Sequence, residues 1–358
     1  MKHIYYIAIL LSLLSCNPNN PINDNTIPLF KTLGSLSYSS TNNIRYNYRI
    51  IQLETSDSIL LDWPVICDIE DSTIWIKSEN IIYSFNLKNG KHIFTIDKRG
   101  NGPYEYNRIG DLRYSPTNHH LYLYDYTTDK IITYTTTGEK INQTKNDTIN
   151  SIGITSEGDI LVAYNPFKSP AHLVGIYDTC FNHINSFINN YTTITNASLS
   201  RTNPICEFNK KNYIYIPDTI YQITRDSVFP FLTIDKGGYK IPIDIESDAS
   251  QKDIRENYVW NDYGFIVNQY FFLSFHHNKR NYFDLWNIKE KTLISRRSTI
   301  DPQHPGLAFE INGQVIYAWP NYVCSDKIYC TLDSEQSSIL VPDYNIENNP
   351  IILEITLL

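Results

Sequence analysis

Short runs of β-branched and aromatic residues recur along this chain, and their rhythm constrains the fold more than any other feature. The clearest unit has such runs at 72–76, 81–85 and 92–96. Further units begin near Leu121, Asp159, Tyr213, Phe271 and Val315. A spacing of roughly 40 to 60 residues is typical of propeller blades, which are small sheets that bury their faces only against neighbouring sheets. The sequence therefore predicts an all-β, six-bladed β-propeller.

A ring of blades must be closed, and the two ends of the chain offer strands for this purpose. The run 351–358 is apolar and β-branched but has no complete blade of its own nearby. Segments 44–53 and 58–61 could supply its partners. We therefore expect N- and C-terminal strands to pair in one blade. No linker rich in Pro, Gly or Ser divides the chain, so residues 30–358 are expected to form a single domain.

The N-terminus has the pattern of a bacterial lipoprotein. An apolar run at 4–14 follows a basic start, is too short to span a bilayer, and ends at Cys16. The residues before Cys16 resemble a lipobox, which predicts a signal peptide over 1–15, lipidation of Cys16 and a polar tether over 16–29. The protein would then be lipid-anchored in the cell envelope, at the inner or the outer membrane. The alternative is an ordinary cleaved signal peptide with an incidental cysteine.

Composition and charge narrow the class of partner. The chain has 28 Tyr, 15 Phe and 5 Trp, which favours strands and offers aromatic contact surfaces. Its formal net charge is −8, with no run of more than two basic residues, so nucleic acid is an unfavourable partner. Apart from Cys16 there are five cysteines and no C-x-x-C pair. Cys324 and Cys330 could bridge a hairpin, but buried thiols are the preferred interpretation.

One segment, 98–106, resembles the G-x-G-P-x-E-Y signature of six-bladed β-propeller lipoproteins of Bacteroidetes. Segments 121–138 and 218–235 extend the resemblance, with Lys236 standing where that family tends to have an aromatic residue. The family has no assigned function and is related in pattern to NHL repeats. The resemblance implies a six-bladed, NHL- or TolB-like fold and a lipid anchor. It implies little about activity, because fold does not determine function.

The signature can also be interpreted from its residue types. Gly100 and Gly102 allow positive φ or a close backbone approach. Pro103 restrains φ in the turn. Glu105 could accept hydrogen bonds from N–H groups of the loop, and Tyr106 could pack beneath them. We expect a structural connection between blades, with a ligand-contacting loop as the alternative.

Asp125 and the histidine pairs are likewise interpreted as structural. Asp125 ends a predicted strand. We expect it to be a turn residue, with a role in a functional site as the alternative. His119–His120 and His276–His277 are neighbours on predicted strands. Neighbouring strand residues point to opposite faces, so neither pair can bind one metal ion together. We predict no metal and no cofactor.

Catalytic motifs are missing from the sequence. It contains no G-x-S-x-G elbow, no H-E-x-x-H and no sialidase-type Asp box. Paired carboxylates could serve a glycosidase or a lyase. The candidates by residue type are Glu105, Asp111, Asp125, Asp262 and Asp284. Spacing in the sequence cannot show which of these carboxylates meet.

Asp-Ser and Asp-Thr triplets recur, and they resemble O-glycosylation acceptors of secreted Bacteroidetes proteins. We prefer the interpretation that they are turn residues before strands. The triplets begin at Asp57, Asp71, Asp147, Asp218 and Asp226.

The leading functional hypothesis is a binding or scaffold module of the cell envelope that holds a glycan, a peptide or a protein in the loops of the propeller. The competing hypothesis is a carbohydrate-active enzyme, either a glycosidase or a lyase, with carboxylate, Tyr or His chemistry in the channel. The sequence contains nothing that identifies the ligand.

Overall fold

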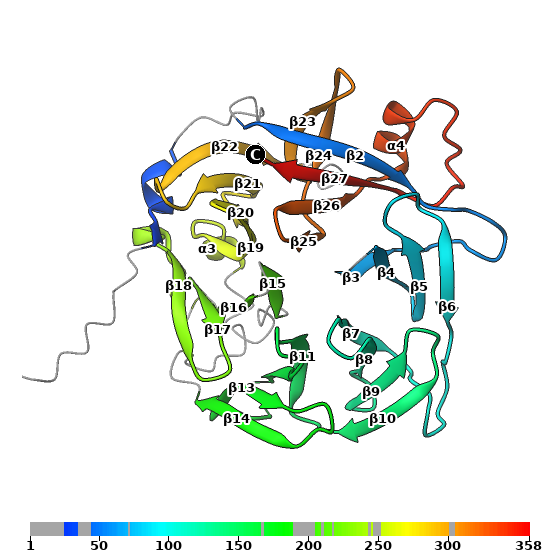
Figure 1. Ribbon diagram of the computed structural model, residues 1–358. Coiled ribbons are helices and arrows are strands. Elements are labelled where there is room, and N and C mark those ends of the chain that lie inside the picture. The colour runs from blue at the N-terminus through cyan, green and yellow to red at the C-terminus, as the bar shows by residue number, and fades with distance from the viewer. Residues whose placement is uncertain are drawn as a thin grey trace, which may run out of the picture.

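The computed structural model is a ring of small antiparallel sheets (Figure 1). It describes residues 25–34, 44–70, 72–165, 168–188, 205–208, 211–216, 218–242, 245, 252–300 and 305–358. The predicted signal peptide and Cys16 lie outside these residues. None of the helices in the described part of the chain is both long and apolar enough to cross a bilayer.

Six sheets surround a central axis, which confirms the predicted six-bladed β-propeller. Blade 1 contains β3 (Val65–Glu70), β4 (Thr73–Ser78), β5 (Ile81–Asn86) and β6 (His92–Ile96). Blade 2 contains β7 (Ile109–Ser115), β8 (His120–Asp125), β9 (Lys130–Thr135) and β10 (Lys140–Lys145). Blade 3 contains β11 (Ile149–Ile154), β12 (Ile160–Tyr164), β13 (His172–Tyr177) and β14 (His183–Ile188).

The remaining blades continue the ring. Blade 4 contains β15 (Cys206–Phe208), β16 (Lys211–Ile216), β17 (Thr219–Ile223) and β18 (Val228–Ile234). Blade 5 contains β19 (Trp260–Val267), β20 (Tyr270–His277), β21 (Arg280–Asn287) and β22 (Thr292–Thr299). Blade 6 contains β25 (Tyr322–Cys324), β26 (Lys327–Thr331), β27 (Ile351–Leu357) and β2 (Tyr46–Gln52).

Blade 6 closes the ring as expected, because its outermost strand comes from the N-terminal part of the chain. Strand β2 pairs antiparallel with β27 along its full length, and Arg49 lies opposite Glu354. The Arg49 guanidinium and the Glu354 carboxylate are 2.6 Å apart, so an ion pair reinforces the seam. The segment 58–61, also offered as a partner, is not a blade strand. It forms a tight turn with a bridge between Ser56 and Ile59.

The fold begins earlier than residue 30, the boundary expected from the polar composition of the tether. Strand β1 (Thr26–Ile27) pairs in parallel with β18, and Leu29 is fully buried in η1 (Leu29–Thr32). The guanidinium of Arg296 donates hydrogen bonds to the carbonyl and the hydroxyl of Thr32. Residues 26–32 therefore belong to the folded domain because of their tertiary contacts, although their local sequence is typical of a linker.

The unit expected to start at Val315 is not a blade. Strands β23 (Leu307–Ile311) and β24 (Gln314–Ala318) form a separate two-stranded hairpin between blades 5 and 6. A hairpin and a pair of blade strands have the same alternation of residue types, so local sequence cannot separate them. The described helices are short: η3 (Gly237–Tyr239), α3 (Lys252–Arg255) and α4 (Ser334–Leu340).

The other unit starts coincide with the second strands of blades, not with the innermost strands. Second strands are buried on both faces and so have continuous apolar runs, as β8 and β20 show. Innermost strands are less regular. In blades 1 to 3 each has a register shift, and the residue just after the shift is Asp68, Asp111 or Ser151. Apolar core fills the seams between adjacent blades.

Candidate functional site

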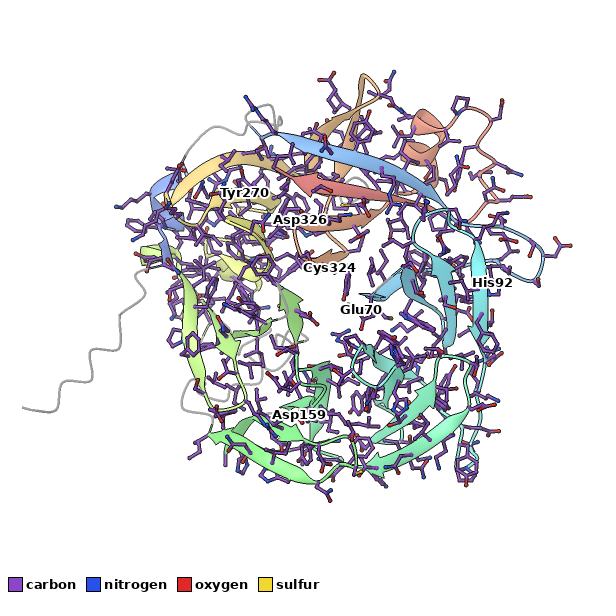
Figure 2. All side chains as sticks on the ribbon, in the orientation of Figure 1. Glu70, His92, Asp159, Tyr270, Cys324 and Asp326 are labelled. Carbon is purple, nitrogen blue, oxygen red and sulfur yellow. The ribbon has the colours of Figure 1, made fainter. Side chains whose placement is uncertain are left out.

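A pocket of about 400 Å³ opens where three innermost strands meet at one end of the channel. Figure 2 places Glu70, Cys324 and Asp326 near the centre of the ring. We call this pocket the channel mouth. The residues that line it are Ile69, Glu70, Leu87, Glu207, Phe208, Tyr322, Val323, Cys324, Ser325, Asp326, Lys327 and Tyr329.

The topology explains why these residues converge. Glu70 ends β3, and Phe208 ends β15. Cys324 ends β25, and the turn to β26 follows with Ser325 at a φ of 56°. The innermost strands of all blades run in the same direction along the axis, so their C-terminal ends reach the same end of the ring. The mouth is therefore assembled from the turns of blades 1, 4 and 6.

Tyr322 connects the mouth to a buried polar network. Its hydroxyl donates to Asp68 Oδ1 at 2.7 Å. The other oxygen of Asp68 accepts the backbone N–H of Tyr114 at 2.7 Å, so one carboxylate joins blades 6, 1 and 2. Burial raises the pKa of Asp68, and the nearby Arg113 guanidinium opposes that rise. These bonds hold the wall of the mouth in one position.

Arg113 bridges the channel beneath this wall. Its guanidinium contacts Asp111 at 2.8 Å and donates to the carbonyls of Cys67 and Ile205 at 3.0 and 2.9 Å. These partners belong to blade 2, to blade 1 and to the residue before β15. Burial raises the pKa of Asp111, and Arg113 again opposes the rise. The carboxylate Asp111 is thus committed to the scaffold.

The residues at the register shifts form a repeated tie between neighbouring blades. Asp68 accepts from Tyr114 N–H, Asp111 accepts from Ile152 N–H at 3.1 Å, and Ser151 Oγ accepts from Ile205 N–H at 3.2 Å. Each acceptor lies on one blade and each donor lies on the next blade or just before it. A buried backbone N–H left without a partner costs about 1–3 kcal/mol, so these ties keep the blades in register.

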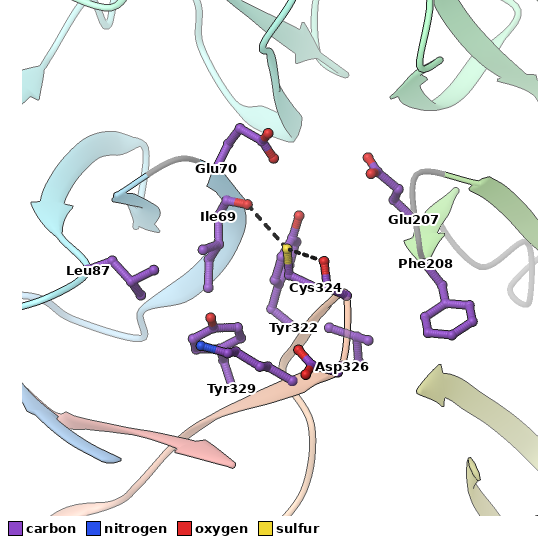
Figure 3. A pocket seen from close by; sticks show the side chains of 12 residues that line it. Ile69, Glu70, Leu87, Glu207, Phe208, Tyr322, Cys324, Asp326 and Tyr329 are labelled. Carbon is purple, nitrogen blue, oxygen red and sulfur yellow. Dashed lines mark hydrogen bonds between the residues drawn. The ribbon is translucent and has the colours of Figure 1, made fainter. Parts of the chain in front are cut away.

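The mouth itself is acidic. Glu70, Glu207 and Asp326 line it, and Figure 3 shows the carboxylates of Glu70 and Glu207 facing each other across the pocket. The cation that lines it, Lys327, contacts Glu354 at 3.2 Å. Glu354 also holds Arg49, and these two partners outweigh burial and lower its pKa. The charge of Lys327 is therefore largely balanced by Glu354.

The thiol in the mouth is not an activated nucleophile. Cys324 Sγ lies 3.7 Å from the carbonyl oxygen of Ile69, as a dashed line in Figure 3 marks. Burial, together with the nearby carboxylates Glu70 and Glu207, raises the pKa of Cys324 to about 11. Thiol nucleophiles need a lowered pKa. The mouth can therefore bind and orient a ligand without offering a thiolate.

The signature loop, residues 98–106, lies away from the channel mouth, between β6 and β7. Glu105 Oε2 accepts the backbone N–H of Gly102 at 2.7 Å. Tyr106 is fully buried and its hydroxyl donates to the carbonyl of Ile96 at 3.1 Å. Gly100 and Gly102 do not have positive φ; a Cβ on Gly100 would overlap the Glu105 carboxylate. Close approach is thus the reason for glycine here. Pro103 is exposed.

Asp125 is a hydrogen-bond hub at the same end of blade 2 as the signature loop. Its carboxylate accepts the N–H groups of Asn107 and Arg108 at 2.9 and 3.2 Å, and the Thr128 hydroxyl at 2.7 Å. Burial disfavours the charged form, but these bonds and one from Thr127 outweigh burial and lower the pKa of Asp125. Asp125 therefore anchors the loop that precedes β7.

Asp284 also belongs to the scaffold. It lies on β21 and is fully buried against Arg296, with oxygen-to-nitrogen distances of 2.7 and 2.5 Å. Trp286 Nε1 donates to the same carboxylate at 3.0 Å. Asp262 lies on β19, but its side chain is outside the described part of the structure. The structure therefore does not bring Glu105, Asp111, Asp125 and Asp284 into one site.

The histidines of each pair have separate partners. His119 Nδ1 lies 2.7 Å from the Tyr114 hydroxyl, and His120 packs against Tyr122. His276 contacts Glu256 at 2.8 Å, and His277 contacts the carbonyl of Tyr258 at 3.3 Å. Among the described residues, no group of three His, Cys, Asp or Glu side chains is placed to hold a metal ion.

Lys236, where the resembled family tends to an aromatic residue, has a local explanation. Its side chain is buried and its ammonium lies 2.5 Å from Asp218. Asp218 also contacts Lys240 at 2.7 Å and has a φ of 71°. This triplet aspartate is thus held in a turn by two lysines. Of the other triplets, Asp57, Asp147 and Asp226 are exposed, and Asp71 lies outside the described residues.

The five cysteines of the described chain are all free, so Cys324 and Cys330 form no bridge. Cys330 is buried and behaves as a small apolar residue. Burial raises the pKa of Cys67 and of Cys206 to about 11. The thiols of these innermost strands therefore stay protonated at neutral pH.

The residues of the channel mouth were not singled out from the sequence, apart from the mention of Cys324 as a bridging candidate. Glu70 ends β3, Glu207 lies within β15, and Asp326 lies in the turn between β25 and β26, so the three share no local motif. The one local signal is that each lies within, at the end of or just beyond an innermost strand. This position can be recognised only when the innermost strands have been identified, and the sequence did not identify them.

Two solved structures share the architecture of this chain. A protein of Bacteroides fragilis NCTC 9343 named for presumed export is 17% identical, with a TM-score of 0.68, covering 90% of this chain and 97% of that one. A member of the DUF4221 family from Bacteroides vulgatus ATCC 8482 is 12% identical, with a TM-score of 0.52, covering 89% and 99%. At these identities the likeness shows the propeller fold alone.

No curated protein matches the sequence of this chain. A family model does match, and it spans residues 25–353, which begins just before β1 and ends within β27. The matched region therefore contains blades 1 to 5, blade 6 up to residue 353, and the channel mouth. On this match the chain belongs to the DUF4934 family, described as a domain of unknown function.

Proposed function

We propose that this protein is a binding module outside the cytoplasm, lipid-anchored in the cell envelope through Cys16, and that its ligand enters the channel mouth. The lipobox-like sequence before Cys16 supports the anchor. The resemblance of 98–106 to lipoproteins of Bacteroidetes, and a fold shared with a protein named for presumed export, support the location. The channel mouth supports the binding role.

The observation that carries the binding role is a preformed pocket with mixed chemistry. Its volume of about 400 Å³ lies within the usual range of ligand sites. Phe208 and Tyr329 supply apolar surface, and Glu70, Glu207 and Asp326 supply hydrogen-bond acceptors. Tyr322 is fastened to Asp68, so the wall is ordered before a ligand arrives. Preorganisation of this kind lowers the entropic cost of binding.

A carbohydrate-active enzyme is the second candidate, and one observation favours it. Glu70 and Glu207 line the same pocket, as the two carboxylates of a glycosidase must. The sequence contains no sialidase-type Asp box, which marks one family of catalytic propellers. The Cys324 thiol is protonated at neutral pH. Binding requires only the geometry that is present, whereas hydrolysis also requires a defined acid and base, so binding is the better-supported function.

A glycan and peptide array tests the proposal. The full chain in detergent is applied as the parent and as the double variant Glu207→Gln, Asp326→Asn. Asp226→Asn is the matched control, because Asp226 is an exposed carboxylate in the β17–β18 turn, outside the mouth. We expect ligands that the parent and the control bind and that the double variant loses. Ligands that all three bind equally would contradict the proposal, and hydrolysed glycans would favour the enzyme.

The anchor is tested separately. Cys16→Ser should release the protein from membranes or leave it unprocessed, because the lipid is attached to the thiol. Fractionation and metabolic labelling with a radioactive fatty acid measure this. Membrane-bound, lipid-labelled Cys16→Ser protein would contradict the anchor.

A further inference from the structure

Two neighbouring loops project from the blade where the ring closes. Loop 53–64 follows β2, and loop 341–350 precedes β27, the strand that pairs with β2. We call them the closure loops. Figure 1 shows both on the same side of the ring, where β2 ends and β27 begins. Loop 53–64 leads into β3 at Val65, whereas the channel mouth lies at the other end of β3, at Glu70. The closure loops are therefore a surface separate from the mouth.

A buried asparagine fastens the two closure loops together. Asn349 Nδ2 donates to the carbonyls of Glu54 and Ile59 at 2.7 and 2.8 Å. Its Oδ1 accepts the N–H of Leu61 at 2.8 Å, and its own N–H donates to the Thr55 hydroxyl at 2.9 Å. Ile59 and Leu61 also pack against the apolar cluster beneath them. Because one residue satisfies four groups of the other loop, the two loops form one ordered surface.

The closure loops carry the two most exposed large apolar side chains of the described residues. Trp63 is 85% exposed and Ile346 is 74% exposed, and Leu60 is a third exposed side chain. Single exposed apolar residues are common on protein surfaces. An exposed indole with two aliphatic side chains in the same pair of loops is less usual, and Trp is the residue type most typical of interface hot spots. The loops therefore offer apolar contact area that the described chain leaves in solvent.

The backbone of Trp63 is fixed in an unusual conformation. Its φ is 48°, in the left-handed region that bulky residues rarely adopt. The residue before it is clamped, because the buried Ser78 hydroxyl accepts the N–H of Asp62 at 2.7 Å and donates to its carbonyl at 2.8 Å. Disfavoured conformations persist where their surroundings fix them, and they are frequent at binding sites. The backbone of Trp63 is thus ordered before a partner binds.

The closure loops are also acidic. They contain five carboxylate side chains and no lysine or arginine. Glu54, at the base of loop 53–64, contacts Lys91 at 3.7 Å. The other four carboxylates are exposed, and they belong to Asp57, Asp62, Asp343 and Glu347. A partner that covers this surface therefore needs positive charge around its apolar contact.

We propose that the closure loops dock a second protein, which receives Trp63 in an apolar pocket surrounded by lysine or arginine side chains. The same charges disfavour two other occupants. A second copy of this chain, in a two-fold dimer, would place acidic loops against each other. A bilayer with anionic lipids attracts basic segments and repels these loops. The inference is independent of the proposed function, and a partner docked here leaves the channel mouth accessible.

Site-specific photo-crosslinking in cells of the source organism tests the proposal. The probe is the full chain with Trp63→p-benzoylphenylalanine. The matched control is Ile300→p-benzoylphenylalanine, because Ile300 is 72% exposed in the connection after β22, outside the closure loops. We expect irradiation to attach one protein at position 63 and none at position 300. Mass spectrometry should locate the cross-link in an apolar pocket of that protein, beside lysine or arginine.

The role of charge is tested in the same cells. Asp57→Lys combined with Glu347→Lys should reduce the adduct at position 63 at least tenfold. The control, Glu139→Lys combined with Asp226→Lys, changes the net charge equally but in turns outside the closure loops, and should reduce the adduct less than twofold. Raising the salt concentration of permeabilised cells from about 0.05 to about 0.5 M should also weaken the adduct, because salt screens exposed charges. The salt series uses no charge variant, so it remains decisive if one of them does not fold.

The proposal would be overturned by the absence of an adduct at position 63, or by an equal adduct at position 300. An adduct that neither the loop charges nor salt affects would also contradict it. An adduct with lipid would assign the closure loops to a bilayer, and one with a second copy of the chain would assign them to a dimer. None of these outcomes concerns the channel mouth, because the array tests the mouth through Glu207 and Asp326. Failure of either proposal can therefore be told from failure of the other.

Discussion

The signature loop and the channel mouth differ in how their polar groups are used. In the loop, Glu105 bonds to Gly102 three residues away, and Tyr106 is buried beneath it. In the mouth, Glu70, Glu207 and Asp326 come from three blades and face a pocket. The loop is recognisable in the sequence because its partners are close along the chain. The mouth has no such pattern, because its members meet only across the ring.

This difference teaches that a recognisable motif need not mark the functional site. Residues that satisfy one another stabilise the fold, and substitution there should cost stability. Side chains that line a cavity are placed to contact a ligand, and substitution of an exposed one should cost binding and little stability. Four substitutions test this contrast in unfolding experiments.

The largest effect is expected for Tyr106→Ala. The ring is fully buried in the seam of blades 1 and 2, and loss of a buried aromatic side chain costs about 3–5 kcal/mol. Tyr106→Phe should cost only about 1 kcal/mol, since it removes the hydroxyl that donates to the carbonyl of Ile96 at 3.1 Å and accepts the N–H of Lys98 at the long distance of 3.5 Å. Urea melts measure both. An unchanged midpoint for Tyr106→Ala would remove the structural role of the loop.

Asp125→Asn should cost about 1–3 kcal/mol near pH 7, because an amide cannot accept all the bonds that the carboxylate accepts. The effect depends on pH. The folded protein lowers the pKa of Asp125 below 3.8, so the charged form stabilises the fold above that pH, and this contribution is lost as the pH falls through the folded pKa. Unfolding free energies of parent and variant should therefore converge in acid. A constant difference from pH 7 to pH 3 would contradict this account.

Gly100→Ala should cost about 1–2 kcal/mol, because its Cβ displaces the Glu105 carboxylate and breaks the bond to Gly102. Adding Gly100→Ala to a Glu105→Ala protein should cost much less, since the overlapping group is gone. A double-mutant cycle measures the coupling. Additive costs would show that Gly100 is required for another reason.

Glu207→Gln should change stability by no more than about 0.5 kcal/mol, because Glu207 is exposed at the rim of the mouth. Together with Asp326→Asn it should reduce ligand binding, as the array experiment measures. If Glu207→Gln alone lowered the free energy of unfolding by several kcal/mol, Glu207 would have a structural role, and the mouth would not differ from the loop in this respect.

Much of the fold was predictable because its evidence is local. The second strands of blades are buried on both faces, so runs such as 121–125 stand out, and the strand 351–357 is apolar enough to require partners. The innermost strands were not recognised, because Asp68, Asp111 and Ser151 interrupt their apolar pattern. Those polar residues make sense only with the N–H donors of the next blade, which the sequence does not place beside them.

What the sequence determined by itself is the all-β character, the six-bladed ring, the pairing of its two ends, and the local bonding of the signature loop. Only the tertiary structure decided that 307–318 is an added hairpin, that Thr26–Ile27 joins blade 4, and that carboxylates of blades 1, 4 and 6 share a pocket. The physical reason is range. Alternation and turn chemistry act between neighbours in the chain, whereas a pocket forms where closure of the ring brings distant strand ends together.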